Sequence, residues 1–169
     1  TAHAGTGLQA APISYEVDGE QYVAVVGGWG GSLGTFHGDP GPSETQQAVG
    51  RVLTYKLGPA EAILPSVEVI QRRVPDIADT DASQDTIRHG AALYLERCSW
   101  CHGYNTIGNG SFPDLRYASL EVHNAWNAIL LGGAYLSRGM PAFEGVLTEE
   151  DAEAIRAYIV RQAQAIGSE

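Results

Sequence analysis

The sequence predicts two structural parts, a short β segment and an all-α domain that follows it. Two observations support this division. Residues 12–26 and 51–57 combine alternating apolar and polar residues with β-branched and aromatic residues, as strands do. From Ser83 onward, apolar residues recur every three or four positions, which is the period of a helix with one buried face. We therefore expect a β segment over residues 1–57, a linker over residues 58–83 and a helical domain over residues 84–169.

The overall composition excludes several classes of function. The 169 residues carry a formal net charge of −10, and Lys56 is the only lysine, so the chain lacks the basic stripe that neutralises nucleic-acid phosphates. No apolar run approaches the ~20 residues that a membrane-spanning helix needs. We expect a globular protein that binds no nucleic acid and has no membrane span.

The β segment begins with a predicted hairpin. Apolar and polar residues alternate from Ile13 to Val17, Asp18-Gly19 forms the turn, and a second strand resumes near Tyr22. The glycine-rich stretch that follows is predicted to be a loop, and residues 51–57 are predicted to form a third strand. Three strands leave sheet edges open and bury little apolar surface, so we expect this segment to be the end of a larger all-β structure.

Prolines and glycines predict the linker, and capping residues predict where the helices begin. Four glycines and prolines with no sustained period mark residues 58–83 as a linker. A helix is predicted from Ser83, a second over residues 119–131, and a third from Thr148, where Asp151 completes a reciprocal cap. Three helices make a thin core for a domain of this length, and a bound prosthetic group would add apolar volume.

The motif Cys98-Ser99-Trp100-Cys101-His102 contains both cysteines of the chain. Zinc would need a second ligand pair, which the sequence does not offer. A redox disulfide of this spacing normally follows a strand, whereas Cys98 ends a helical pattern. Two structural thiols remain a further alternative. We favour covalent haem c, because two thiols three residues apart can both bond to the porphyrin and the adjacent imidazole of His102 can then bind its iron.

Met140 is the candidate for the second axial iron ligand. It is the only methionine, and it lies in a loop between Gly139 and Pro141, although a lone methionine can also be core filler. The other histidines (His3, His37, His89 and His123) are interpreted as exposed polar residues or helix-surface partners. With His102 and Met140 both bound, the iron would have no open position and would only exchange electrons.

Several of these residues together resemble a class I c-type cytochrome over residues 84–166. They are Gly90, Tyr94, the motif from Cys98 to His102, Pro113, Met140 and Tyr158. The resemblance implies that Gly90 and Tyr94 pack against Tyr158, and that the Pro113 carbonyl holds the far nitrogen of the histidine. Without the resemblance, Pro113 would be a loop breaker and Gly90 a tolerated helix glycine.

Two arginines are candidates for the haem propionates. Arg116 and Arg138 lie near the residues of the resemblance, and a guanidinium pairs well with a carboxylate. Ordinary surface arginines are the competing interpretation.

The β segment resembles a different part of a known enzyme family. Residues 7–31 and 50–57 are similar to the closing segment of the eight-bladed propeller of quinohaemoprotein alcohol dehydrogenases, in which a linker then leads to a c-type cytochrome domain. The resemblance implies pyrroloquinoline quinone (PQQ) and calcium in the parent enzyme, held mostly outside this segment, and no catalytic residue can be assigned here. Trp29 either approaches the quinone pocket or packs within a propeller blade.

We therefore expect the C-terminal part of a periplasmic bacterial quinohaemoprotein alcohol dehydrogenase. The haem would accept electrons from reduced PQQ and pass them to a small redox protein or a membrane quinone pathway. The alternative is a free-standing electron carrier that docks on a separate dehydrogenase.

Overall fold

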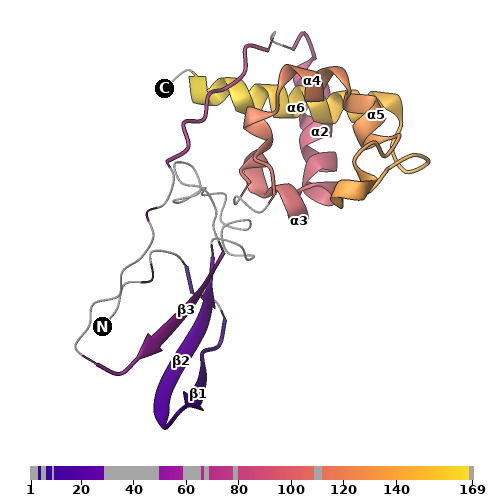
Figure 1. The fold of residues 1–169 in the computed structure, drawn as a ribbon. Coiled ribbons are helices and arrows are strands. Elements are labelled where there is room, and N and C mark those ends of the chain that lie inside the picture. The colour runs from indigo at the N-terminus through magenta and orange to yellow at the C-terminus, as the bar shows by residue number, and fades with distance from the viewer. Residues whose placement is uncertain are drawn as a thin grey trace.

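The chain folds into a small sheet and a helical domain (Figure 1). The structure is a computed structural model, and it describes residues 4, 7–8, 10–28, 50–58, 66, 69–77, 80–108 and 112–167. The strands are β1 (Ile13–Val17), β2 (Glu20–Gly27) and β3 (Arg51–Lys56). The α-helices are α2 (Gln84–Arg97), α3 (Ser99–His102), α4 (Leu120–Asn124), α5 (Trp126–Leu130) and α6 (Glu149–Gly167). Single 3-10 turns occur at η2 (Tyr104–Thr106), η3 (Leu115–Tyr117) and η4 (Leu136–Arg138).

The three strands form one antiparallel sheet in the order β1-β2-β3. The tight turn between β1 and β2 has positive φ at both Asp18 (53°) and Gly19 (79°), which suits the twist of a two-residue hairpin. The predicted hairpin and third strand are confirmed, with β3 ending at Lys56.

Several apolar side chains on one face of this sheet are exposed, although Ala24 on the same face is buried. The register pairs Ile13 with Ala24 and Val26 with Val52, and directly paired side chains share a face. Val26 is 55% exposed and Val52 72% exposed on that face. Exposed apolar side chains grouped in this way are typical of a surface that contacts another part of a protein.

Capping residues fix where the two long helices begin. The hydroxyl of Ser83 accepts a hydrogen bond from the backbone N–H of Thr86 at 3.1 Å, so α2 starts where the sequence predicted. At α6, the Asp151 N–H donates to the Thr148 hydroxyl and the Thr148 N–H donates to the Asp151 carboxylate, each at 3.1 Å. The predicted reciprocal cap is confirmed.

The single helix predicted over residues 119–131 is wrong, because the structure divides it into α4 and α5. Ala125 lies between them with φ −95° and ψ 15°, outside the helical region. The break turns Trp126 toward α6, where its indole N–H donates to the Ala152 carbonyl at 2.7 Å. A buried indole needs such an acceptor, so a tertiary contact outweighs the regular helical period here.

The helical domain is organised around the crossing of α2 and α6. A Cβ atom added to Gly90 would lie 1.9 Å from the Ala154 carbonyl oxygen, so only glycine permits this approach. One turn further along α2, the ring of Tyr94 lies 5.4 Å from the ring of Tyr158. The predicted contact of Tyr94 with Tyr158 is thus confirmed, whereas Gly90 packs on the backbone of Ala154 and Ile155 in the same helix as Tyr158.

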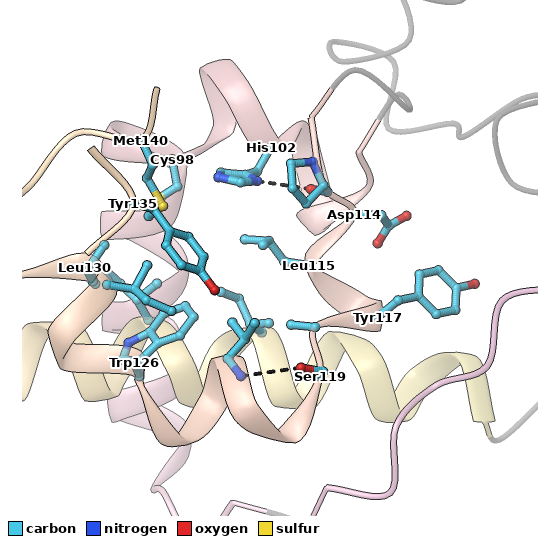
Figure 2. A pocket seen from close by; sticks show the side chains of 16 residues that line it. Cys98, His102, Asp114, Leu115, Tyr117, Ser119, Trp126, Leu130, Tyr135 and Met140 are labelled. Atoms are coloured by element: carbon cyan, nitrogen blue, oxygen red, sulfur yellow. Dashed lines mark hydrogen bonds between the residues drawn. The ribbon is translucent and has the colours of Figure 1, made fainter. Parts of the chain in front are cut away.

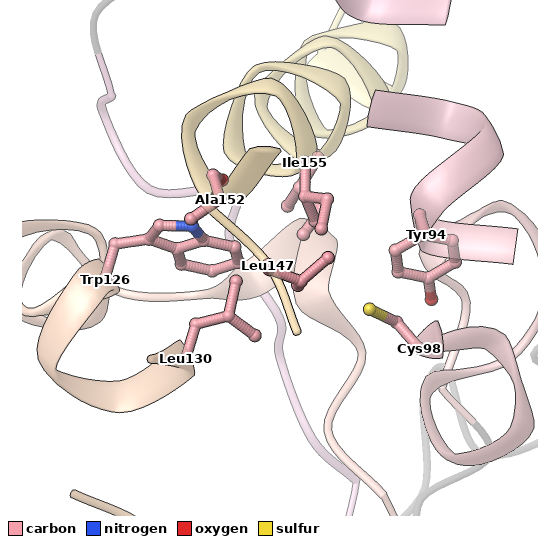
Figure 3. Close-up of a cluster of buried hydrophobic side chains, with 8 residues drawn as sticks. Tyr94, Cys98, Trp126, Leu130, Leu147, Ala152 and Ile155 are labelled. Carbon is pink, nitrogen blue, oxygen red and sulfur yellow. Dashed lines mark hydrogen bonds between the residues drawn. The ribbon is translucent and has the colours of Figure 1, made fainter. Parts of the chain in front are cut away.

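The core of this domain gathers residues from α2, α5, α6 and the loop that precedes α6 (Figure 3). Its buried members are Tyr94, Cys98, Trp126, Leu130, Leu147, Ala152, Ile155 and Ile159. Cys98 is part of this cluster, which places one thiol of the motif at the edge of the core.

The segment between the two parts has neither helix nor strand over residues 70–77. It contacts the helical domain where the Arg72 guanidinium lies 5.5 Å from the centroid of the Tyr117 ring. In the described part of the chain, no helix combines the length and hydropathy that crossing a lipid bilayer requires.

Candidate functional site

The cysteine motif forms one helical turn at the end of α2. The N–H of Cys98 donates to the Tyr94 carbonyl at 2.8 Å, and the N–H of His102 donates to the Cys98 carbonyl at 2.9 Å, so α3 continues almost directly from α2. Side chains three residues apart on a helix lie on neighbouring parts of one face. Cys98 is buried and Cys101 is exposed, so the two thiols flank the rim of the domain.

The buried thiol is neutral at physiological pH. Burial, reinforced by the neighbouring Cys101, raises the pKa of Cys98 to about 12. Neither cysteine is in a disulfide, and both are free thiols in this structure. Of the two thiols, Cys98 lines the cavity described below, whereas Cys101 is exposed and is not among the residues that line it.

His102 is oriented by a hydrogen bond from its ring. Its Nδ1 lies 3.0 Å from the Pro113 carbonyl oxygen, which can only accept, so Nδ1 carries the proton and Nε2 keeps its lone pair. Burial lowers the pKa of His102, and the Pro113 carbonyl acts in the opposite direction. The result is a neutral imidazole with its metal-binding nitrogen available.

A cavity of about 270 Å³ lies between this turn and the helices α4, α5 and α6 (Figure 2). It is lined by Cys98, His102, Pro113, Asp114, Leu115, Tyr117, Ala118, Ser119, Val122, Trp126, Ile129, Leu130, Tyr135, Met140, Ile155 and Ile159. The lining is mostly apolar, as small-molecule and cofactor sites are.

The lining residues fit a haem. Packed protein interiors rarely leave voids much larger than a water molecule, and this cavity far exceeds that size. Its walls are aliphatic and aromatic, while a thiol, an imidazole and a thioether from Cys98, His102 and Met140 reach it. The Cys98 thiol could form a thioether bond to a haem, and the His102 imidazole and the Met140 thioether are groups that bind haem iron.

Met140 reaches the cavity from a constrained loop. Gly139 ends η4 in the left-handed conformation with φ 88°, and the N–H of Met140 donates to the Tyr135 carbonyl at 3.2 Å. Met140 is partly buried against the core, and Figure 2 shows its side chain at the same cavity as Cys98 and His102. The loop therefore fixes the backbone that carries the sulfur.

The two arginines predicted for the propionates have protein partners and do not line this cavity. Arg116 is buried and pairs with Asp114 through Nε at 2.9 Å and Nη2 at 2.6 Å. Arg138 is exposed, with its guanidinium 4.4 Å from the centroid of the Tyr135 ring. Trp29 lies outside the described residues.

Sequence reasoning did not identify several residues that line the cavity, including an aromatic pair and a buried acid. Trp126 and Tyr135 form aromatic walls of the cavity, and the buried residue Asp114 is also among the residues that line it. Trp126 carried a signal, because it belonged to the predicted helix as a core residue. Tyr135 and Asp114 lie in loops, where periodicity gives no information.

His123 differs from its predicted exposed position. It is only 7% exposed, and its ring stacks on Trp126 with 6.1 Å between centroids. Its Nδ1 is buried and has no hydrogen-bond partner among the described residues. Burial and the nearby Arg156 lower the pKa of His123, while Glu153 acts in the opposite direction. His89, by contrast, is a helix-surface partner as predicted, with Nε2 2.8 Å from the Asp151 carboxylate.

The helical domain and this site have the features expected of a c-type cytochrome domain. Residues 85–159 match the family described as cytochrome c oxidase, cbb3-type, subunit III. The chain is also similar over 98% of its length to quinohemoprotein alcohol dehydrogenase ADH-IIG of Pseudomonas putida, at 38% identity, and to 1-butanol dehydrogenase (cytochrome c) of Thauera butanivorans, at 35% identity. The predicted resemblance to quinohaemoprotein alcohol dehydrogenases is confirmed.

A solved structure shows the same similarity in three dimensions. Quinohemoprotein alcohol dehydrogenase ADHIIG from Pseudomonas putida HK5 superposes on 96% of this chain with a TM-score of 0.77 and 36% sequence identity. The chain spans 23% of the length of that structure and of both relatives.

Proposed function

We propose that this chain is the C-terminal part of a periplasmic quinohaemoprotein alcohol dehydrogenase and that it transfers electrons through a covalently bound haem c. Cys98 and Cys101 hold the haem through thioether bonds, and His102 and Met140 bind its iron. The observation that carries this proposal is the meeting of Cys98, His102 and Met140 at one apolar cavity. When bound, the haem supplies one-electron chemistry between ferric and ferrous iron.

The protein groups have distinct tasks in this proposal. The Pro113 carbonyl fixes the His102 ring with Nε2 facing the iron, and such an outer hydrogen bond strengthens the ligand. Trp126, Tyr135 and the aliphatic walls exclude water from the faces of the haem. If His102 and Met140 both bound the iron, no coordination position would remain for a substrate, and the domain would transfer electrons while bond chemistry would occur in another part of the enzyme.

The remainder of the proposal concerns the parent enzyme. Residues 1–57 close an eight-bladed propeller, residues 58–83 link it to the cytochrome domain of residues 84–169, and the missing blades hold PQQ and calcium. Two facts support it: the chain spans 23% of its relatives, and an apolar face of the sheet is exposed. The electrons come from reduced PQQ and leave to a small redox protein or a membrane quinone pathway.

The native gene product tests this assignment. We expect a polypeptide several times longer than this chain, in which an added alcohol reduces the haem in the presence of PQQ and calcium. A native product that begins near Thr1 and is reduced only when a separate dehydrogenase is added would contradict it. That result would support the free-standing electron carrier.

A further inference from the structure

The segment Phe112–Tyr117 supplies the acceptor that orients His102. Its Pro113 carbonyl lies 3.0 Å from His102 Nδ1. The ring of a histidine turns about its χ bonds unless a partner holds it, so the place of this carbonyl determines where Nε2 points. What holds Pro113 in place therefore matters to the iron ligand.

Gly108 packs tightly against one side of this segment. A Cβ atom at residue 108 would lie 2.5 Å from the Phe112 carbonyl oxygen and 2.5 Å from the Asp114 nitrogen. Both contacts are with backbone atoms, which cannot rotate away as a side chain could. The backbone on either side of Pro113 therefore rests directly on the chain at Gly108.

An ion pair ties down the residue that follows Pro113. The Asp114 carboxylate accepts hydrogen bonds from the Arg116 backbone N–H at 3.1 Å, from Nε at 2.9 Å and from Nη2 at 2.6 Å. The Asp114 carbonyl accepts a further bond from the Tyr117 N–H at 3.2 Å. These bonds close the η3 turn immediately after Pro113 and leave Asp114 little freedom to rotate.

The pair is buried. The side chain of Asp114 is 3% exposed and that of Arg116 is 10% exposed. A buried ion pair costs desolvation and is often no more stabilising than apolar residues of the same shape, so its value lies in fixed geometry. The two-point contact of a guanidinium with a carboxylate defines both distance and direction.

We propose that Asp114 and Arg116 act as one positioning unit, which holds the Pro113 carbonyl on His102 Nδ1 and thereby sets the strength of the iron's imidazole ligand. This inference rests on the proposed haem site. It gives Arg116 a role different from the predicted propionate contact. A firmly held acceptor makes the imidazole a better electron donor, which favours ferric iron and lowers the midpoint potential.

Two variants of the haem-loaded full chain test the proposal. Arg116→Lys keeps the charge but removes the two-point contact, and Asp114→Asn/Arg116→Gln removes both charges together, so neither changes the net charge. The matched control is Asp85→Asn/Arg88→Gln, which removes an exposed ion pair on α2. Intact mass establishes in every case whether the haem is attached.

The direct measurement is the solvent exchange rate of the His102 Nδ1 proton by NMR, together with the midpoint potential. In both variants we expect exchange about tenfold faster than in the unsubstituted chain, as loss of a well-held hydrogen bond implies, and a higher midpoint potential. The control should match the unsubstituted chain in both measurements.

Three results would overturn the proposal. The first is unchanged exchange and potential in variants that carry haem. The second is a lower potential in both variants. The third is failure of both variants to bind haem while the control is loaded, because the pair would then be a folding requirement. An unsubstituted chain without haem would instead refute the proposed function.

Discussion

At the scale of single residues, each side chain of the site is determined by its immediate partners. His102 keeps one nitrogen protonated because Nδ1 faces the Pro113 carbonyl at 3.0 Å, and burial lowers its pKa, so the ring is neutral. The backbone of Met140 is fixed by the left-handed turn at Gly139 and by the hydrogen bond that its N–H donates to the Tyr135 carbonyl. The sequence predicted these residues from the motif spacing and from the single methionine, whereas Asp114 and Tyr135 needed the tertiary structure.

Replacing Met140 separates its role as a ligand from its role as core filler. Met140→Leu keeps the apolar volume but removes the sulfur, so we expect stability within about 1.5 kcal/mol of the unsubstituted chain. In haem-loaded protein this variant should bind carbon monoxide, as should Met140→Ala. The absorption spectrum of the reduced protein under carbon monoxide measures it. A spectrum that stays unchanged in both variants would make Met140 core filler.

His123 predicts a pH dependence of stability. Its folded-state pKa is lowered, chiefly by burial, so as pH falls below the ordinary histidine value of about 6.5 the unfolded chain takes up a proton before the folded chain does. This stability is therefore complete above that pH and declines below it. His123→Gln should flatten the decline between about pH 7 and 5. Urea unfolding at a series of pH values measures it, and an equally steep decline in the variant would contradict the assignment.

At the scale of elements, the α2–α6 crossing holds the site together. Cys98 is the residue that follows the end of α2, and it packs in the same core as Ile155 and Ile159 of α6. The crossing of α2 and α6 therefore positions the cysteine motif. Helix starts were predictable because Ser83 and Thr148 form their caps with neighbouring residues. The break at Ala125 was not predictable, because the contact between Trp126 and Ala152 that accompanies it links residues 26 positions apart.

Gly90→Ala tests the crossing. The added methyl group would meet the Ala154 carbonyl at 1.9 Å, and α2 and α6 must separate to admit it. We expect a loss of at least about 2 kcal/mol in the free energy of unfolding of the helical domain, measured by urea titration with circular dichroism. Gly50→Ala is the control, since no atom of the described residues lies within 4 Å of its added carbon. Equal stability of the two variants would contradict the close approach.

At the scale of the whole molecule, the two parts differ in how much of their apolar surface is buried. The helical domain encloses its own core, whereas the sheet leaves Val26 and Val52 exposed as a pair on one face. The alternating pattern predicted the three strands, and it predicted exposed apolar side chains because three strands cannot cover themselves. What covers the sheet could not be predicted from the pattern, because in the proposed parent enzyme the covering residues lie outside residues 1–57.

The exposed face predicts how the chain behaves by itself. We expect the isolated chain to self-associate through this face. Val26→Glu/Val52→Lys, which places opposite charges on a cross-strand pair, should reduce that association. Sedimentation velocity measures it, and Val23→Lys on the other face is the control. Association that persists in the double variant but disappears in the control would place the apolar contact elsewhere.

The central claim is that Cys98 and Cys101 bind one haem covalently, with His102 beneath its iron. The most direct measurement is the intact mass of the denatured chain after production with haem-attachment machinery. The account predicts the mass of the polypeptide plus one haem, with no thiol left to react with an alkylating reagent. A mass of the polypeptide alone, with two thiols that alkylate fully, would contradict it.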